Sequence, residues 1–536
     1  MISLKENESF TADSLFKQSR FWFFSLLLTY SFFWIPAIHI FPSLSPGDMG
    51  RDLYQYQRTL EGELPFRDYW TQYGPLMFFY YAFWFLVGGV NLMSARIALG
   101  VIYLLTAVSA YLALRLFVSP AVAFLSSLAF LNLDMTWTFN HIGALPLMLL
   151  SIFCLWKFFL TQRSGWCYGG ALALTGVALI KISAGLAAFL AFYLSVALYQ
   201  GLRRNPPLKH LIFLPLLFAI LTAAVYGLLF LGSSFDWIKH CLTFESKYRI
   251  SYNSPWTNFK HLILRYTVWE PVRLLGVAAV FLSALLGYFG LKKGTDPRGQ
   301  TRIFFFVLVS LVFFGAANSL DYFLMEGYIY RFDFWLFPIT VLLLGLLGGW
   351  GSAFFQRPLR IFLGGLIFLA LTAWPFQNLR QALAWKIPER YLDFPQGKVY
   401  LGGALSDVQV MKEGTRFLME HTKPEEEILA IPYNPVYCFL SNRRHAAREF
   451  QFMRQNQVSL QAQEEIIQRL ETRRVPFVLI SNQYRSEEKG FGNFGETHCQ
   501  RLAQYLWANY GEVQTFGSWD PASGDLHAIK LLRKKG

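Results

Sequence analysis

The stretch from Gly47 to Leu76, GDMGRDLYQYQRTLEGELPFRDYWTQYGPL, places acids, arginines and tyrosines between two strongly apolar runs. Helical spacing would bring its first charged residues onto neighbouring turns, and these are Asp48, Arg51, Asp52 and Arg58. Such a face can hold a catalytic base and a phosphate together, because a carboxylate accepts a proton and guanidinium groups form paired, charge-assisted hydrogen bonds with phosphate oxygens. Charged groups beside the hydrocarbon boundary are costly unless they are paired or functional. This stretch is therefore the candidate site.

The rest of the chain has the composition of an integral membrane protein. Of its 536 residues, 54% are hydrophobic and only 15% are charged, which is too apolar for an ordinary soluble enzyme. Apolar runs of roughly 17 to 25 residues, long enough to cross a bilayer as helices, fill much of the first two thirds. We expect about eleven spans, at Phe21–Phe41, Leu92–Phe117, Pro120–Trp137, Ile142–Leu160, Trp166–Ile180, Ser183–Tyr199, Leu211–Leu231, Val272–Leu291, Ile303–Asn318, Phe334–Trp350 and Ile361–Pro375. The shorter run Met77–Val90 predicts a helix that lies at the membrane surface.

Lysine and arginine residues recur on alternate loops, which predicts that the N-terminus lies in the cytoplasm. Reading Trp166–Tyr199 as one long span would invert every later loop, so we expect two short spans there. The same alternation of cytoplasmic and external loops places the candidate site and the C-terminal third outside the cytoplasm. Phe21–Phe41 has no small-residue cleavage site, so we expect it to be retained as a first span. The net charge of +14 reflects basic cytoplasmic loops and does not indicate nucleic acid.

The apolar spans stop near Gln377. We therefore divide the chain into a transmembrane module (1–376), with a first external loop (42–91), and a small C-terminal α/β domain (377–536) outside the cytoplasm. The expected elements of this domain are a helix capped by Ser406 and ending near Glu420, a strand Glu427–Ile431, a helix Gln461–Glu471, a strand Val475–Ser481, a helix Glu496–Tyr510, and strands around Val513 and Leu526–Leu532. It contains no GxGxxG, Walker or GxSxG motif, which argues against a nucleotide site or a hydrolase.

Two features of this domain leave alternatives open. PYNPVYCFLSNRR, Pro432–Arg444, predicts a loop with an exposed tyrosine and two arginines. Such a segment is either an ordinary solvated loop or a docking surface for an acceptor. Cys438 and Cys499 would both face an oxidising space, where they either form a disulfide or remain free.

The order of several motifs resembles the GT-C membrane glycosyltransferases, and among them the protein O-mannosyltransferase-like and lipid A aminoarabinose transferase-like enzymes. The resemblance rests on an acid just after the first span with an arginine three residues on, and on LEGELPFRDYWTQYGPL, LMSARIALG with Arg96, LIKISAG, YIYRFDFWLFP with Pro338, and EEEILAIPYNPVYCFLSNRR. It implies transfer of a sugar from a polyprenyl-phosphate carrier to a glycan, lipid or protein acceptor. It also implies an enzyme embedded in the lipid bilayer of the bacterial inner (cell) membrane.

The resemblance assigns roles to residues of this chain. By position, Asp48 matches the general base of a single inverting displacement, and we expect Arg51 and Arg331 beside the carrier phosphate. Further donor-binding candidates are Arg58, Lys181 and Tyr73, and candidates for positioning a substrate are Asp52, Asp134 and His141. Asp48 and Asp52 could share a divalent ion, as in the oligosaccharyltransferase branch, but no second acid pair matches them, so we expect no cofactor or metal.

One departure from the relatives leaves the donor open. Aminoarabinose transferase-like enzymes tend to carry a lysine close before the proline of the first loop, where this chain has QYGP, Gln72–Pro75. Phosphate binding at this position is therefore in question, and so is the identity of the sugar.

Structural explanations compete with each of these roles. Asp48 could only cap a helix, Lys181 could extend to lipid headgroups, and Arg331 could pair with Asp333. The remaining candidates for simple surface pairing are Asp52, Arg58, Arg67 and Asp68. Two other functions also compete. A flippase or transporter of lipid-linked sugars should show inverted halves with ionisable groups near the midplane, and an O-antigen polymerase or ligase should carry its large loop late in the chain.

Overall fold

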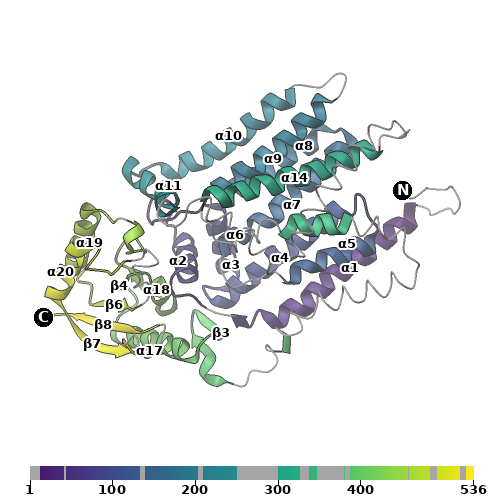
Figure 1. Cartoon of the computed structure of the whole chain (residues 1–536). Coiled ribbons are helices and arrows are strands. Elements are labelled where there is room, and N and C mark those ends of the chain that lie inside the picture. Colours follow the sequence, from purple (N-terminus) through teal and green to yellow (C-terminus); the bar gives the residue numbers. More distant parts are fainter. Residues whose placement is uncertain are drawn as a thin grey trace, which may run out of the picture.

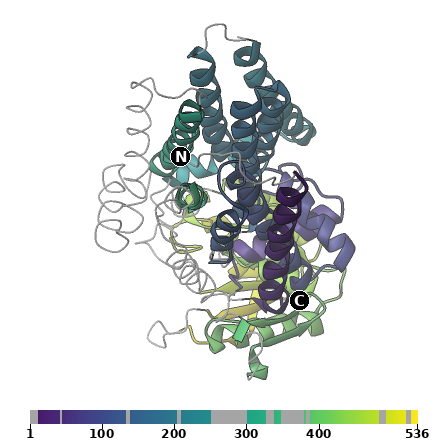
Figure 2. The same cartoon turned by 90° about the vertical axis from the view of Figure 1, so that its right-hand side faces the viewer.

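The computed structural model describes residues 12–41, 44–132, 139–202, 209–249, 300–325, 337–346, 379–380, 387–456, 458–482, 492–519 and 527–536. A bundle of long helices forms one end of the molecule and a group of strands and shorter helices forms the other, with helix α2 (Asp48–Leu60) between them (Figure 1). Seen from the side of the bundle, the green and yellow C-terminal elements lie behind the helices (Figure 2).

The bundle contains four described helices, or helical segments, that are long and apolar enough to cross a membrane. These are α4 (Leu92–Leu114), the segment Asn140–Thr161 that ends in α7 (Ala144–Thr161), α9 (Ile182–Gly201) and α10 (Lys209–Phe230). Other described elements of this part are α1 (Ala12–Ala37), α3 (Leu76–Gly88), α5 (Pro120–Ser127), η1 (Leu128–Asn132), α6 (Phe139–Ile142), α8 (Ser164–Ala178), α11 (Phe235–Arg249), α14 (Gln300–Met325) and the apolar helix Phe337–Leu346. The total of eleven spans stays a prediction, because Val272–Leu291 and Ile361–Pro375 lie outside the described residues.

The apolar region from Trp166 to Tyr199 forms two helices, as the loop charges predict. Helix α8 ends at Ala178 and α9 begins at Ile182, so the chain turns back on itself over three residues. A side chain at Gly185 would overlap the backbone of Ala178, and its absence lets the two helices approach closely. The turn brings Lys181 to the start of α9.

Helix α2 is rich in polar residues and nevertheless buried from Met49 to Thr59. One side packs on α3, where the Tyr56 and Tyr81 rings stack with centroids 4.3 Å apart. The other side packs on α18 (Pro435–Ser441). A Cβ atom at Gly50 would lie 2.5 Å from Val436 Cβ, so this contact requires a glycine. The candidate helix is thus held between the bundle and the C-terminal region.

The C-terminal region is built on a five-stranded sheet with the order β5-β4-β6-β8-β7. Strand β4 is parallel to β5 and β6, whereas β8 is antiparallel to β6 and β7. Its strands are β4 (Glu427–Ile431), β5 (Arg444–His445), β6 (Phe477–Ser481), β7 (Tyr510–Phe516) and β8 (Ile529–Lys534), and its helices are α17 (Leu405–His421), α18, α19 (Leu460–Thr472), α20 (Gln500–Asn509) and the single turn η4 (Arg454–Asn456).

Helices cover both faces of this sheet, as the strand sequences require. The residues of β4 alternate, so Ile428 packs in one core with α17 and α18, and Leu429 packs in a second core with α19 and α20. All five residues of β4 and of β6 are buried, which explains the continuous apolar runs Ile428–Ile431 and Phe477–Ile480 within them.

A second, three-stranded sheet joins the segment after the first helix to the start of the C-terminal region. Strand β1 (Ile40–Phe41), directly after α1, pairs in parallel with β3 (Gly397–Leu401), which also pairs with β2 (Tyr391–Phe394); the turn η3 (Pro388–Arg390) precedes β2. This pairing was not expected from the sequence.

One C-terminal expectation is wrong, and one open alternative is decided. Ser406 does not cap α17, because the helix begins at Leu405 and Ala404 occupies the capping position. Cys438 and Cys499 are free and buried, since they lie in the cores on opposite faces of the sheet. The expected strand Glu427–Ile431 is confirmed, and the expected helix Gln461–Glu471 is confirmed to within one residue at each end.

Candidate active site

Asp48 and Arg51, in the first turn of α2, form a hydrogen-bonded cluster with Tyr433, which lies between β4 and α18. Arg51 Nη1 donates to the Tyr433 hydroxyl (2.8 Å) and to Asp48 Oδ1 (3.3 Å), and the Tyr433 hydroxyl donates to the same Asp48 oxygen (2.7 Å). The Asp48 side chain is 49% exposed, whereas that of Arg51 is fully buried. Asp48 does not cap the helix through its side chain, because Gly47 holds the capping position, but as the acid of the first turn it does lie where the helix dipole favours a negative charge. Two donors therefore fix one oxygen of a carboxylate that is open to solvent.

Asp52 lies on the buried side of the same guanidinium. Its Oδ1 accepts from Arg51 Nε (2.8 Å) and Nη2 (2.6 Å). Burial raises the pKa of Asp52 to about 6, and the favourable charge of Arg51 only partly offsets that effect. Burial alone would lower the pKa of Arg51, but Asp52, Tyr433 and Asp48 together raise it well above its ordinary value. Arg51 therefore stays positively charged between two acids.

Aromatic rings extend the cluster toward the bundle. The Arg51 guanidinium lies 5.1 Å from the centre of the Tyr73 ring, and the Tyr73 ring lies 4.9 Å from that of His141, edge to face. Next to His141, Asn140 accepts a hydrogen bond of 3.0 Å from the Tyr56 hydroxyl. The structure thus brings two predicted residues, Tyr73 and His141, to the cluster on Asp48.

The loop that contains QYGP packs against the turn that carries Lys181. The Gly74 amide donates to the Ile180 carbonyl and the Leu76 amide to the Leu179 carbonyl, both at 2.9 Å. A Cβ atom at Gly74 would overlap the Leu179 carbonyl oxygen. The Lys181 side chain is 3% exposed, so the explanation that it extends to headgroups is wrong. The loop without the expected lysine therefore lies beside a buried lysine from another helix.

Arg58 lies away from the cluster, near the other end of α2. It forms ion pairs with Glu61 and Glu63, because the chain turns back after the helix ends at Leu60. The guanidinium of Arg58, which was expected to bind a phosphate, is therefore already paired with two carboxylates. Surface pairing of Arg67 with Asp68 is confirmed at 2.8 Å, whereas surface pairing of Asp52 is wrong because that side chain is buried.

The sequence did not identify Tyr433 as a site residue. Its segment was expected to expose a tyrosine, but Tyr433 is 2% exposed and the residues after it form α18 against α2. The description of Pro432–Arg444 as a solvated loop is therefore wrong. One signal could have found it: the segment follows directly on a fully buried strand of a parallel pair, and sites form beyond the carboxyl ends of such strands.

Three expectations fall outside the described residues. Arg331, its possible partner Asp333, and Asp134 lie in 326–336 and 133–138, so their roles stay predictions.

An arginine lies between the two carboxylates that a shared metal ion would need. Arg51 donates to Oδ1 of both Asp48 and Asp52, and a divalent cation would have to displace this positive charge and bind oxygens at about 2.0–2.6 Å. Within the described ranges, no group of three or more His, Cys, Asp or Glu side chains could hold a metal. As arranged, the two aspartates do not fit a shared metal ion.

Solved structures share the fold of this chain over most of its length. ArnT from Cupriavidus metallidurans in the apo state matches with a TM-score of 0.58 and 12% identity, over 95% of this chain and 97% of that chain. ArnT bound to undecaprenyl phosphate matches with a TM-score of 0.55 and 12% identity, over 95% and 98%. An Archaeoglobus fulgidus oligosaccharyltransferase in complex with zinc and sulfate matches with a TM-score of 0.54 and 11% identity, over 91% and 71%. No protein-family model and no curated protein matches the chain.

These matches confirm the fold that the motifs predict. The chain is a largely helical membrane protein with the GT-C fold, which both neighbours share.

Proposed function

From the GT-C fold and the cluster on α2, we propose that this chain transfers a sugar from a polyprenyl-phosphate carrier to an acceptor on the extracytoplasmic side of the bacterial inner membrane. The reaction inverts the anomeric centre, and Asp48 is the general base. The observation that carries this proposal is the half-exposed Asp48 carboxylate, held by Arg51 and Tyr433 beside the membrane helices. The fold shared with ArnT bound to undecaprenyl phosphate supports the class of donor.

The arrangement leaves one oxygen of Asp48 for the acceptor. Both hydrogen bonds from Arg51 and Tyr433 reach Oδ1, and no described residue donates to Oδ2. In the proposed step, Oδ2 of Asp48 takes the proton of the acceptor hydroxyl while the oxygen of that hydroxyl bonds to the anomeric carbon of the sugar. The bond from that carbon to the carrier phosphate breaks, and its electron pair leaves with the phosphate.

The contacts of Arg51 change the role that the motifs suggest for it. All three of its nitrogens already donate to Asp48, Asp52 or Tyr433, which leaves little capacity for a phosphate. We assign Arg51 to positioning Asp48. Lys181, beside the QYGP loop, and Arg331 then stabilise the negative charge that develops on the carrier phosphate. Lys181 would supply from α9 the charge that relatives place within the first loop.

A transfer assay tests this proposal. Purified protein in nanodiscs is given a polyprenyl monophosphate with a labelled sugar, and glycosyl transfer to cell-envelope acceptors is measured. Asp48→Asn should reduce transfer by about 10²- to 10⁴-fold, because a general base contributes that much. The matched control is Asp393→Asn, which changes an exposed aspartate of β2 and should leave transfer unchanged. Full transfer by Asp48→Asn, or carrier movement across sealed vesicles without transfer, would overturn the proposal.

The orientation is tested separately. A reporter that is active only outside the cytoplasm, fused after Leu532 of β8, should be active, and the same reporter before α1 should be inactive.

A further inference from the structure

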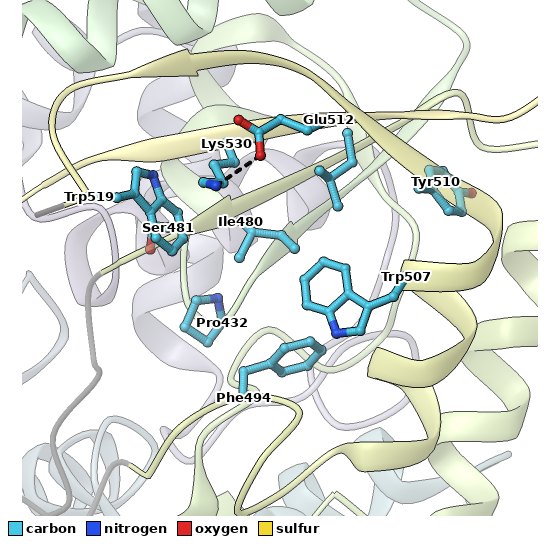
Figure 3. A pocket seen from close by; sticks show the side chains of 10 residues that line it. Pro432, Ile480, Ser481, Phe494, Trp507, Tyr510, Glu512, Trp519 and Lys530 are labelled. Atoms are coloured by element: carbon cyan, nitrogen blue, oxygen red, sulfur yellow. Dashed lines mark hydrogen bonds and ion pairs between the residues drawn. The ribbon is translucent and has the colours of Figure 1, made fainter.

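A cavity of ≈ 350 Å³ opens on the C-terminal sheet, apart from the cluster on Asp48 (Figure 3). Its size falls in the usual range for a small-molecule site. Its side chains come from β6, β7 and β8, from α20, from Pro432 directly after β4, and from the segments around Phe494 and Trp519.

Aromatic rings form much of the wall. Trp507 and Phe494 lie next to each other on one side of the cavity, and Trp519 lies on the opposite side (Figure 3). Trp507 is 52% exposed, although it is among the largest apolar side chains. When a ligand with an apolar face covers an aromatic ring that is open to water beside a cavity, the apolar surface is removed from water and binding is favoured.

One ion pair forms the polar part of the wall. Lys530 on β8 donates to Glu512 on β7 at 2.8 Å, and its ammonium also lies 5.0 Å from the Trp519 ring. Both side chains are partly exposed, at 33% and 46%. The pair has no net charge, yet it still presents donor and acceptor groups to a ligand. A neutral ligand with many hydroxyl groups fits this wall better than an anion, which would meet Glu512.

The geometry points to a carbohydrate, and we propose that this cavity binds a neutral oligosaccharide. The axial and ring C–H groups of a sugar form an apolar face that packs on an indole, and its hydroxyls bond to carboxylate and ammonium groups. Both kinds of contact are available here within one cavity: the rings of Trp507, Phe494 and Trp519, and the Lys530–Glu512 pair.

A short segment connects the cavity with the candidate active site. Pro432 lines the cavity, and the next residue, Tyr433, donates to Asp48. Ser481, also in the wall, accepts a hydrogen bond of 2.7 Å from Asn434. The cavity therefore holds an acceptor glycan near the base. This role as an acceptor site rests on the proposed function, whereas the binding of an oligosaccharide in the cavity is independent of it.

Binding to the full-length protein in nanodiscs tests the proposal. The probes are maltotetraose, chitotetraose and mannotetraose, with a heparin tetrasaccharide and an aromatic tetrapeptide for comparison, and binding is followed by saturation-transfer NMR and titration. At least one neutral tetrasaccharide should bind more tightly than the heparin fragment and the peptide. Trp507→Ala should weaken that binding about tenfold or more, and Glu512→Gln should weaken it several-fold.

Matched controls exist in the same region. Glu464 is about as exposed as Glu512 and forms an ion pair with Arg501 at 2.6 Å, but it does not line the cavity, so Glu464→Gln should not change binding. Leu460→Ala, at an exposed position, should not change it either. The proposal is overturned if no neutral tetrasaccharide binds, if the peptide or the heparin fragment binds better, or if Trp507→Ala binds like the wild type.

The test separates this site from the proposed function. Asp48→Asn should bind the tetrasaccharide normally. Normal binding without any transfer by the wild type would contradict the proposed function alone, and transfer without tetrasaccharide binding would contradict the cavity assignment alone.

Discussion

The Tyr433 hydroxyl donates a hydrogen bond of 2.7 Å to Asp48 Oδ1, across 385 positions of the chain. The same hydroxyl accepts from Arg51, so all three groups form a closed triangle at the start of α2. One partner comes from the C-terminal region and the other two from α2, which follows the first helix of the chain. Both hydrogen bonds to the proposed base are therefore made only when these two parts of the chain are docked.

Removing this hydroxyl should impair the chemical step more than substrate binding. A hydrogen bond to a charged group contributes about 1.5–3 kcal/mol, and about 1.4 kcal/mol corresponds to tenfold in rate. Tyr433→Phe should therefore lower kcat by about ten- to a hundredfold and leave KM for the lipid donor nearly unchanged. Steady-state transfer kinetics measure both constants. Tyr199→Phe removes a similar buried hydroxyl contact, to the Phe159 carbonyl at 3.1 Å, and should not change kcat. A purely structural role of Tyr433 would instead lower the amount of folded protein without changing kcat.

The docking of α2 on α18 should depend on Gly50. A methyl group there would lie 2.5 Å from Val436 Cβ and 2.6 Å from its amide nitrogen, which is backbone and cannot rotate away. Gly50→Ala should destabilise the protein by about 1–3 kcal/mol, as overpacking does, and should lower transfer because Tyr433 moves away from Asp48. Thermal unfolding and transfer activity are measured together. Gly227→Ala is the control, because a methyl group at that helical position meets no atom within 4 Å. Equal behaviour of the two variants would contradict this account.

Local patterns predicted much of the secondary structure. The strand Glu427–Ile431 and the helix predicted at Gln461–Glu471, observed at Leu460–Thr472, could be anticipated because a buried apolar run and a 3.6-residue period are set by neighbouring residues. The split between α8 and α9 was anticipated from loop charges, since membrane orientation couples every loop to the next.

Contacts between distant segments could not be predicted in this way. Neither the pairing of Ile40 with Tyr400 nor the bond from Tyr433 to Asp48 leaves a local pattern. Arg58 shows the opposite error. Its helical spacing from Asp48 suggested a shared face, but the nearby Glu61 and Glu63 bind it first. Spacing along a helix thus identifies Asp48 and Arg51 as neighbours without showing which charges are already paired.

Asp52 should make stability depend on pH. Burial raises its pKa from 3.8 to about 6, so between these values the folded protein binds more protons than the unfolded chain. Stability due to Asp52 is therefore present at low pH and decreases as the pH rises through this window. The stability of the wild type relative to Asp52→Asn should decrease from pH 4 to pH 6.5 and then level off.

Denaturant unfolding of both proteins at several pH values measures this difference. The difference is used because burial lowers the pKa of His445 and His527 to about 4, which acts in the opposite direction in both proteins. Asp68→Asn is the control, because partial burial of that carboxyl is outweighed by Arg67 and its other partners, which lower its pKa. A constant difference across the range would show that folding does not raise the pKa of Asp52.

Chelation should not affect glycosyl transfer. The positive charge between Asp48 and Asp52 is supplied by Arg51, which donates to Asp48 at 3.3 Å and to Asp52 at 2.6 Å, so a shared cation would have to displace it. Transfer measured after treatment with EDTA and dialysis should equal that of the untreated protein, and added Mn²⁺ or Zn²⁺ should not increase it. Arg51→Lys is an informative companion, because an ammonium cannot bridge both carboxylates as a guanidinium does, and its activity should fall without becoming metal-dependent. If EDTA abolished transfer and a divalent ion restored it, the two aspartates would have to rearrange around a metal and Arg51 would lose its assigned role.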